Sequence, residues 1–192
     1  MNKQTRWLTR TALLLALALL FQSLRAVIPK IMVPGFGELD QYIIGSLVNT
    51  VLILAAITTG ITGGIAVSIL TPLVALMQGE IAFPVMTPFV ALGNMALVIF
   101  VALLYNRNKI ASFVTGTIAK FITLYLTINF IVIPIITPDL PAEKAGVVRT
   151  MLSFKFGYPQ LVTAAIGSII AFGLIPVLER VLKENFSLKN IK

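Results

Sequence analysis

The sequence predicts an all-α membrane protein with six transmembrane helices and both termini in the cytoplasm. Three observations lead to this fold class: composition, long apolar runs and the distribution of charge. Of the 192 residues, 58% are hydrophobic and 11% charged, whereas a soluble domain has about 45–50% and about 25%. The mean hydropathy is +0.98. A chain of this length is expected to form one domain, here residues 1–192.

The apolar residues gather in runs close to the ~20 residues that a helix needs to cross a bilayer. The expected spans are residues 7–25, 42–58, 61–78, 85–105, 110–136 and 157–182. The first begins with basic residues, as a signal peptide does, but no clean small-residue cleavage pattern follows, so we expect a retained helix. The second and third meet at TTGITGG, whose glycines suit a tight connection. The fifth is long, and Pro134 and Pro138 mark its end.

The positive charges orient these spans. Nine Lys and Arg residues fall on the side of the termini: Lys3, Arg6, Arg10, Arg107, Lys109, Arg180, Lys183, Lys189 and Lys192. The opposite side has five: Arg25, Lys30, Lys144, Arg149 and Lys155. With Glu179 and Glu184 the first side nets +7, and with Glu38, Asp40, Glu80, Asp139 and Glu143 the second nets zero. The positive side is expected to be cytoplasmic. Because the basic residues flank apolar segments, the lipid bilayer, and not nucleic acid, is the expected partner surface.

The connections on the outer side are longer than those on the cytoplasmic side. They span residues 26–41, 79–84 and 137–157. Long loops in a compact protein are usually functional. We therefore expect a lid over an outward-facing pocket, with Gln41 and Tyr42 close to it; the alternative is that these loops are only solvated connectors.

Polar residues recur at helical spacing on the second to sixth spans. Small ones such as Ser, Thr and Gly favour close helix packing, whereas large polar side chains inside a membrane indicate a substrate path. The candidate substrate-binding residues are Lys120, Asn94, Gln160, Gln78, Thr123, Thr127, Tyr42 and Asn49.

Lys120 is the least expected of these residues, because it lies near the middle of an apolar span. A lysine there costs about 2.5–3.5 kcal/mol on insertion scales. Snorkelling toward an interface is the alternative explanation, but from the midplane its reach is incomplete. The spans offer no carboxylate near their middle. The sequence therefore predicts that the partner of Lys120 is an anionic or strongly hydrogen-bond-accepting substrate.

Several kinds of chemistry are excluded by composition. The chain has no histidine and no cysteine, so Ser–His–Asp catalysis, histidine zinc sites, histidine proton relays and disulfides are ruled out. It has neither a Gly-rich phosphate loop nor paired carboxylates at catalytic spacing. We expect no enzyme, no cofactor and no metal site.

The chain as a whole resembles the substrate-binding S components of energy-coupling factor (ECF) vitamin transporters. The first span reads TALLLALALL, with Ala12 and Ala16 four residues apart and Ala18 beyond, and the segment from Gly45 to Val98 also resembles members of this family, including the pair Gly93–Asn94. The resemblance implies a protein of the bacterial cell membrane that binds a vitamin-like small molecule. It also implies a transmembrane coupling subunit, docked at Ala12 and Ala16, and two ATP-binding subunits that drive uptake.

The resemblance places the substrate under the loops after the first, third and fifth spans, against the fourth to sixth. No arrangement typical of a thiamine binder is present, and pantothenate or a similar small carboxylate suits Lys120 better than a cation. If Lys120 lies too deep, it would instead bond helix carbonyls or face the coupling subunit. Two other classes stay open: a stand-alone secondary transporter or channel, and a membrane scaffold. The lack of a buried Asp or Glu in the spans argues against ion coupling.

Overall fold

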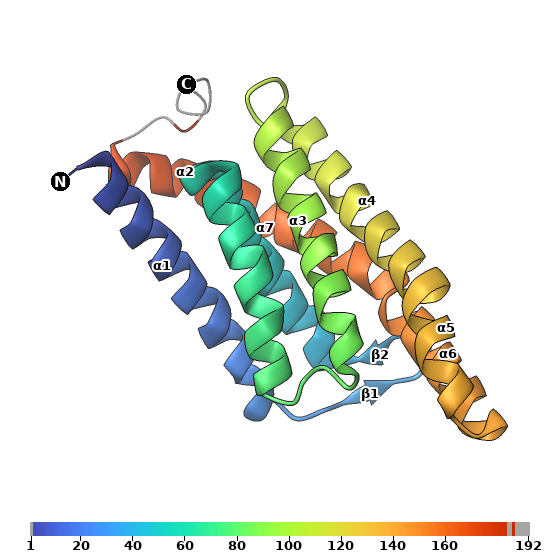
Figure 1. Cartoon of the computed structure of the whole chain (residues 1–192). Helices are drawn as coiled ribbons and strands as arrows, with labels where there is room; N and C mark the ends of the chain where they lie inside the picture. Colours follow the sequence, from blue (N-terminus) through green and yellow to red (C-terminus); the bar gives the residue numbers. More distant parts are fainter. Residues whose placement is uncertain (1, 184–185, 187–192) are drawn as a thin grey trace.

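The computed structural model describes residues 2–183 and 186 and is an elongated bundle of helices (Figure 1). Glu184, Lys189 and Lys192, which enter the charge count above, lie outside the described residues. The main helices are α1 Lys3–Ser23, α2 Leu39–Met77, α3 Thr87–Leu104, α4 Lys109–Thr127, α5 Ile133–Ile136, α6 Ala142–Lys155 and α7 Tyr158–Leu182. Short 3₁₀ turns at Leu24–Ala26, Pro84–Met86 and Thr137–Asp139 and a π-helical turn at Ile128–Val132 complete the helical structure.

Helix α2 contains a reversal of the chain. Its 39 residues are interrupted at Gly60, whose φ of 75° and ψ of −172° are not helical. Glycine adopts positive φ without strain because it has no Cβ. The two halves of α2 then run side by side, back to the end of the molecule from which the helix began (Figure 1). The tight connection expected within TTGITGG therefore lies at Gly60.

Five segments among the described residues are long and apolar enough to cross a membrane: Lys3–Ala26, Leu39–Met77, Pro84–Leu104, Lys109–Asp139 and Ala142–Leu182. The second contains the reversal at Gly60, and the fifth joins α6 to α7. The fifth expected span continues as a helix through Pro134 into α5 and ends in the turn at Thr137–Asp139, close to the prolines that predicted its end.

Helix α2 lies at the centre of the bundle and packs against α1, α3 and α7, while α4 contacts α3 and α7. The closest approach of α2 to α7 depends on Gly167. A Cβ at this position would lie 2.7 Å from the Cβ of Asn49 and 2.8 Å from the carbonyl oxygen of Ser46. Only glycine therefore allows the two backbones to approach this closely, as small residues do at other membrane helix contacts.

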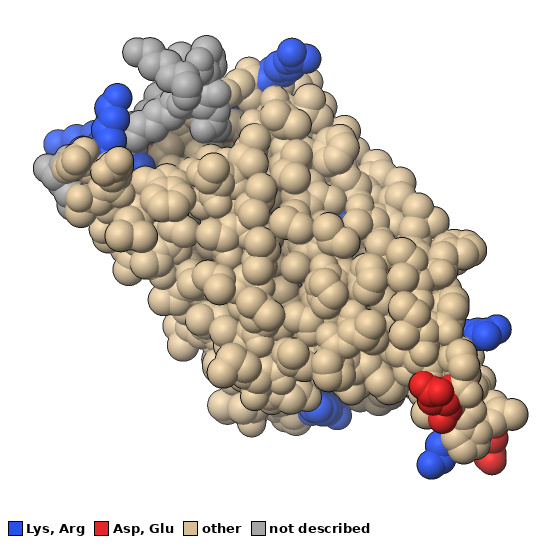
Figure 2. Space-filling model, viewed as in Figure 1, with Lys and Arg blue, Asp and Glu red and all other residues tan. Residues whose placement is uncertain are grey.

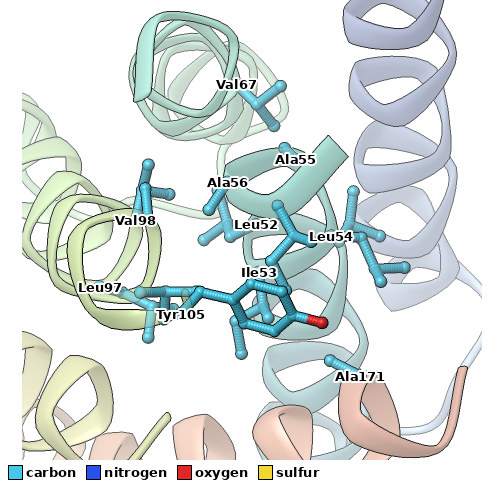
Figure 3. Close-up of a cluster of buried hydrophobic side chains, with 14 of the residues drawn as sticks. Leu52, Ile53, Leu54, Ala55, Ala56, Val67, Leu97, Val98, Tyr105 and Ala171 are labelled. Atoms are coloured by element: carbon cyan, nitrogen blue, oxygen red, sulfur yellow. The ribbon is translucent and has the colours of Figure 1, made fainter. Parts of the chain in front are cut away.

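The main hydrophobic core lies in the half of the bundle toward Gly60, which we call the Gly60 end. It combines residues 51–57 of α2 with Leu97, Val98 and Val101 of α3 and with Ala171 of α7. Tyr105 is 1% exposed, and its ring lies among these side chains (Figure 3). Apolar side chains thus dominate the core of this half of the molecule.

The other end, which we call the hairpin end, holds the long connections. Residues 26–41 include an antiparallel hairpin of β1 Met32–Val33 and β2 Gly37–Glu38, named the outer hairpin below. The connection 137–157, expected to be a loop, contains the 14-residue helix α6, so that expectation is wrong. Pro141 precedes the helix and Gly157 follows it. Helix α6 was not predicted because its charged residues interrupt the apolar runs by which the spans were recognised.

Charged side chains occur at the two ends of the molecule, and the broad middle of the face in view has hardly any (Figure 2). Basic residues near the start of α1 and in the α3–α4 turn lie at the Gly60 end, while residues of both signs lie near α6 (Figures 1 and 2). An uncharged belt between two charged ends is the pattern of a protein that spans a bilayer.

Candidate binding cavity

A cavity of about 140 Å³ lies toward the hairpin end, between α1, α2, α3, α4 and α7. The end of α6 and the connection that follows α2 also contribute to its lining. More than half of the lining residues are polar: Gln22, Arg25, Gln41, Asn49, Thr71, Glu80, Asn94, Lys120, Lys155, Gln160 and Thr163. Apolar atoms still make up most of the cavity surface, and a largely apolar hollow with a few convergent polar groups is the usual form of a small-molecule site.

Lys120 of α4 is a deep residue of this cavity, with 4% of its surface exposed. Its ammonium donates hydrogen bonds to Oδ1 of Asn49, at 2.5 Å, and to Oδ1 of Asn94, at 2.7 Å. These residues come from three different helices. A lysine ammonium has three hydrogens, so two are used by the amides and one is left for another acceptor.

The two asparagines supply oxygen atoms but no charge. Asn49 also donates from Nδ2 to Oγ1 of Thr163, at 3.3 Å, which connects α2 to α7. Arg25 and Lys155, which also line the cavity, form ion pairs, whereas Lys120 forms none within the described part of the chain. Among the described residues, Lys120 is therefore the lysine of the cavity that no carboxylate pairs with.

The rim of the cavity is formed by paired charges. Arg25 Nε lies 3.5 Å from Oδ2 of Asp40, and Arg25 Nη1 lies 3.2 Å from Oε2 of Glu80. Lys155 Nζ lies 3.4 Å from Oε2 of Glu38. Arg25 thus connects the end of α1 to the start of α2 and to the α2–α3 connection.

Asp40 corrects one expectation from the sequence. We expected it in the outer connection and expected no buried carboxylate in the spans, but it lies in the first turn of α2 with 1% of its surface exposed. The helix begins at Leu39, directly after the outer hairpin, which draws Asp40 under the rim and against Arg25. The argument against ion coupling that used this absence therefore fails.

Three polar contacts connect the outer hairpin, α2 and α7. The Tyr42 hydroxyl donates to the carbonyl of Phe36 at 2.6 Å and lies 2.9 Å from the hydroxyl of Tyr158. Tyr158 in turn donates to the carbonyl of Gly35 at 3.3 Å. Together with the pair between Lys155 and Glu38, these contacts hold the hairpin beside the cavity.

The carbonyl of Lys155, at the end of α6, is capped by two side chains of the cavity. Gln41 Nε2 donates to it at 2.9 Å and Gln160 Nε2 at 3.4 Å. Terminal helix carbonyls have no partner within the helix, so these amides satisfy one of them. Gln41 and Gln160 therefore fix α6 to the cavity wall.

Of the eight candidate substrate-binding residues, four line the cavity: Lys120, Asn49, Asn94 and Gln160. Gln78 is exposed and donates to Oγ of Ser23. Thr123 and Thr127 are partly buried one and two turns beyond Lys120, and Thr127 donates to the carbonyl of Thr123. Tyr42 supports the outer hairpin. These last four residues do not line the cavity.

The sequence did not single out several lining residues. Gln22, Arg25 and Lys155 belong to this group. Gln22 was the detectable one, because it is a large polar residue within the first apolar run. Arg25 and Lys155 could not be found in this way, because a charged residue in a connection between helices does not by itself indicate a cavity.

Ala12 and Ala16, the expected docking residues, lie on an exposed face of α1. The opposite face of this helix is buried at Thr11, Ala18 and Gln22. The two alanines are therefore free of contacts that would cover them within the bundle. Leu13 and Leu20, which are 65% and 60% exposed, continue the same outward surface.

The apolar helices and the nearly uncharged middle of the face shown in Figure 2 define a polytopic membrane protein, and the internal cavity gives it a candidate binding site. The family model described as ECF transporter, substrate-specific component, matches residues 6–179, and the chain belongs to this family. The resemblance seen in the sequence is thereby confirmed. Its members are transport proteins rather than enzymes. Neither the curated proteins nor the solved structures include a match to the chain.

Proposed function

We propose that the chain captures a small, vitamin-like anion at the outer face of a bacterial cell membrane. A transmembrane coupling subunit and two ATP-binding subunits then drive uptake of the solute. Membership in the family of ECF substrate-specific components supports the general role. The choice of an anion rests on one observation, the unneutralised ammonium of Lys120 in the cavity.

Burial makes this ammonium a strong anion-binding group. A buried charge is costly unless it is paired and hydrogen-bonded, and the oxygens of Asn49 and Asn94 supply only hydrogen bonds. A carboxylate or phosphate on the ligand would add the missing charge, and attraction is stronger in a low-dielectric site than in water. A small carboxylate of the pantothenate type suits this site better than a cation such as thiamine.

We assign ligand contact to Lys120, Asn49, Asn94 and Gln160, all of which line the cavity. Tyr42 would act indirectly, by holding the outer hairpin over the ligand. Gln78, Thr123 and Thr127 are outside the lining and have no direct contact in this proposal.

We further propose six membrane crossings with both termini in the cytoplasm. The reversal at Gly60 divides the long second segment into two antiparallel halves, which adds one crossing to the five candidate segments. The excess of Lys and Arg at the Gly60 end supports a cytoplasmic position for that end. The cavity, near the hairpin end, would then face outward.

The decisive experiment is affinity purification of the full chain from its native membrane, with mass spectrometry of retained proteins and small molecules. We expect one membrane subunit, two ATPases and a small anion. A chain that transports a solute without any ATPase would instead be a stand-alone transporter or channel, and a chain that retains no solute at any stage would be a scaffold.

The docking face provides a sharper version of this test. Ala16→Trp places a large ring on the exposed face of α1, where close approach of another helix needs a small residue. We expect loss of co-purification and of uptake, with ligand affinity of the isolated protein unchanged. Ala111→Trp, on the exposed start of α4, is the matched control and should assemble normally. Normal assembly of Ala16→Trp would show that α1 docks through another face.

A further inference from the structure

We infer that the cavity has a second recognition point on α1: the side-chain carbonyl of Gln22, which accepts a hydrogen bond from a hydroxyl or amide N–H group of the ligand. This inference rests on the proposed function, because it concerns the same cavity. It narrows the substrate class to small anions that carry a hydrogen-bond donor at a distance from the charged group.

The orientation of the Gln22 amide is set by its neighbour. Gln22 is 8% exposed, and its Nε2 donates to the backbone carbonyl of Thr71 at 3.3 Å. A carbonyl can only accept, so the nitrogen must face Thr71 and Oε1 must point elsewhere. This Oε1 is buried and has no hydrogen-bond partner.

An unpartnered buried oxygen is uncommon in folded proteins and carries a desolvation cost. Gln22 lines the same cavity as Lys120, so a bound molecule can reach it. The protein groups nearby do not serve it: the Thr71 hydroxyl donates to the carbonyl of Val67, and Pro72 has no backbone N–H. Arg25, one turn further along the chain, also lines the cavity, but its guanidinium pairs with Asp40 and Glu80. The remaining source of a donor is a molecule within the cavity.

Lys120 and Gln22 give the cavity two chemically different walls. The ammonium on α4 attracts an anion and retains one unused hydrogen, whereas the amide oxygen on α1 accepts a hydrogen bond. A plain alkyl carboxylate can pair with the Lys120 ammonium but has no donor for the Gln22 oxygen. A hydroxy acid or an amide-containing acid of suitable length satisfies both.

This recognition point also connects the ligand to the helix proposed for docking. Gln22 lies on the buried face of α1, and Ala12 and Ala16 lie on its exposed face. Arg25, one turn further, also lines the cavity. A ligand bonded to both Gln22 and Lys120 would therefore connect the end of α1 to α4.

The test uses the purified full chain in detergent and two series of probes at millimolar concentration. One series is straight-chain carboxylates of four to six carbons, and the other is the same acids with a terminal hydroxyl. Binding is measured from the rise in melting temperature, since a ligand of the folded state stabilises it. We expect at least one hydroxy acid to bind about fivefold more tightly than its matched carboxylate.

Two variants assign this gain to Gln22. Gln22→Met removes the acceptor and should abolish the advantage of the hydroxy acid while the plain carboxylate still binds; Gln22→Leu repeats the test with a different side chain. Gln78→Met is the matched control, because Gln78 also connects α2 to the end of α1 but lies outside the cavity. It should retain the full advantage.

The outcomes separate this inference from the proposed function. Equal binding of both series, or an unchanged hydroxyl advantage in Gln22→Met and Gln22→Leu, overturns the role of Gln22 and leaves Lys120 as the anion site. A hydroxyl advantage that depends on Gln22 but survives in Lys120→Met supports the Gln22 site and refutes the anion-binding role of Lys120. If no probe changes the melting temperature, both are overturned.

Discussion

Lys120 is held by neutral oxygen atoms alone, which makes its contribution to ligand binding measurable. Replacing it with Met keeps the length of the side chain and removes the charge. If Lys120 binds an anionic ligand, Lys120→Met should weaken affinity at least tenfold, or about 1.4 kcal/mol. Isothermal titration with the ligand recovered from the native membrane measures this directly.

Lys109→Met is the control for this variant. Lys109 is the first residue of the same helix, α4, and is exposed, with its Nζ 5.3 Å from the centre of the Tyr105 ring. Its replacement should leave affinity unchanged. Unchanged affinity together with lost uptake in Lys120→Met would move Lys120 from ligand binding to the coupling step.

At this scale the sequence identified the central residues but not all of their partners. The spacing of Asn49, Asn94 and Lys120 indicated polar faces on three helices, and these faces do meet. Spacing along one helix cannot say which faces oppose each other. That is why Gln78 was chosen and Gln22 was not, although both lie near the ends of apolar runs.

At the scale of the elements, the contact between α2 and α7 sets the position of Asn49. Gly167→Ala would force a Cβ to within 2.8 Å of the Ser46 carbonyl, a backbone atom that cannot rotate away. We expect a loss of about 1–3 kcal/mol in the free energy of unfolding, as for other overpacked sites. Denaturant unfolding in detergent measures the loss.

Gly173→Ala is the matched control on the same helix, because a Cβ there meets nothing within 4 Å. Alanine also favours the helix over glycine, so this variant should be as stable as the natural chain or slightly more stable. Equal destabilisation by both substitutions would mean that α2 and α7 pack less closely than described.

The outer hairpin should respond to ligand. It has few backbone hydrogen bonds and is attached mainly by Tyr42, Tyr158 and the pair of Lys155 with Glu38. Regions of this kind open locally at low cost. If the hairpin closes over the cavity, amide hydrogen exchange at residues 32–38 should slow at saturating ligand.

The internal reference for this experiment is the turn at residues 105–108, which lies at the Gly60 end, away from the cavity. Its exchange should not change. Equal exchange of the hairpin with and without ligand would leave it as a solvated connector, the alternative that its sequence allowed.

The sequence predicted the elements unequally. Apolar runs located the long helices, and a glycine cluster located the reversal, because both are consequences of local composition. Helix α6 was missed because its alternation of charged and apolar residues does not resemble a membrane span. The start of α2 was misplaced because the helix includes Asp40, whose burial depends on a distant partner, Arg25.

For the whole molecule, the main prediction is its orientation in the membrane. The chain has no cysteine, so single-cysteine variants report one position each. Thr5→Cys lies at the Gly60 end and Gly146→Cys on α6, where a Cβ meets nothing within 4 Å. In intact cells a membrane-impermeant maleimide should label Gly146→Cys and should label Thr5→Cys only after permeabilisation.

The two variants serve as controls for each other, because the two positions are expected on opposite sides of the membrane. Labelling of Thr5→Cys in intact cells, with protection of Gly146→Cys, would invert the orientation and place the cavity toward the cytoplasm. Six crossings place an odd number of them between residues 5 and 146, so labelling of both variants from one side would contradict the proposed six.

The apolar core at the Gly60 end has a consequence for the energetics of the cell. The polar lining of the cavity ends near Asn49 and Lys120, and beyond it lie the packed side chains of residues 51–57, Leu97, Val98 and Tyr105 (Figure 3). The side chains of this cluster are apolar apart from the Tyr105 hydroxyl, so the packing resists the passage of water and ions. A membrane can therefore hold many copies of this protein without short-circuiting the ion gradients that it stores.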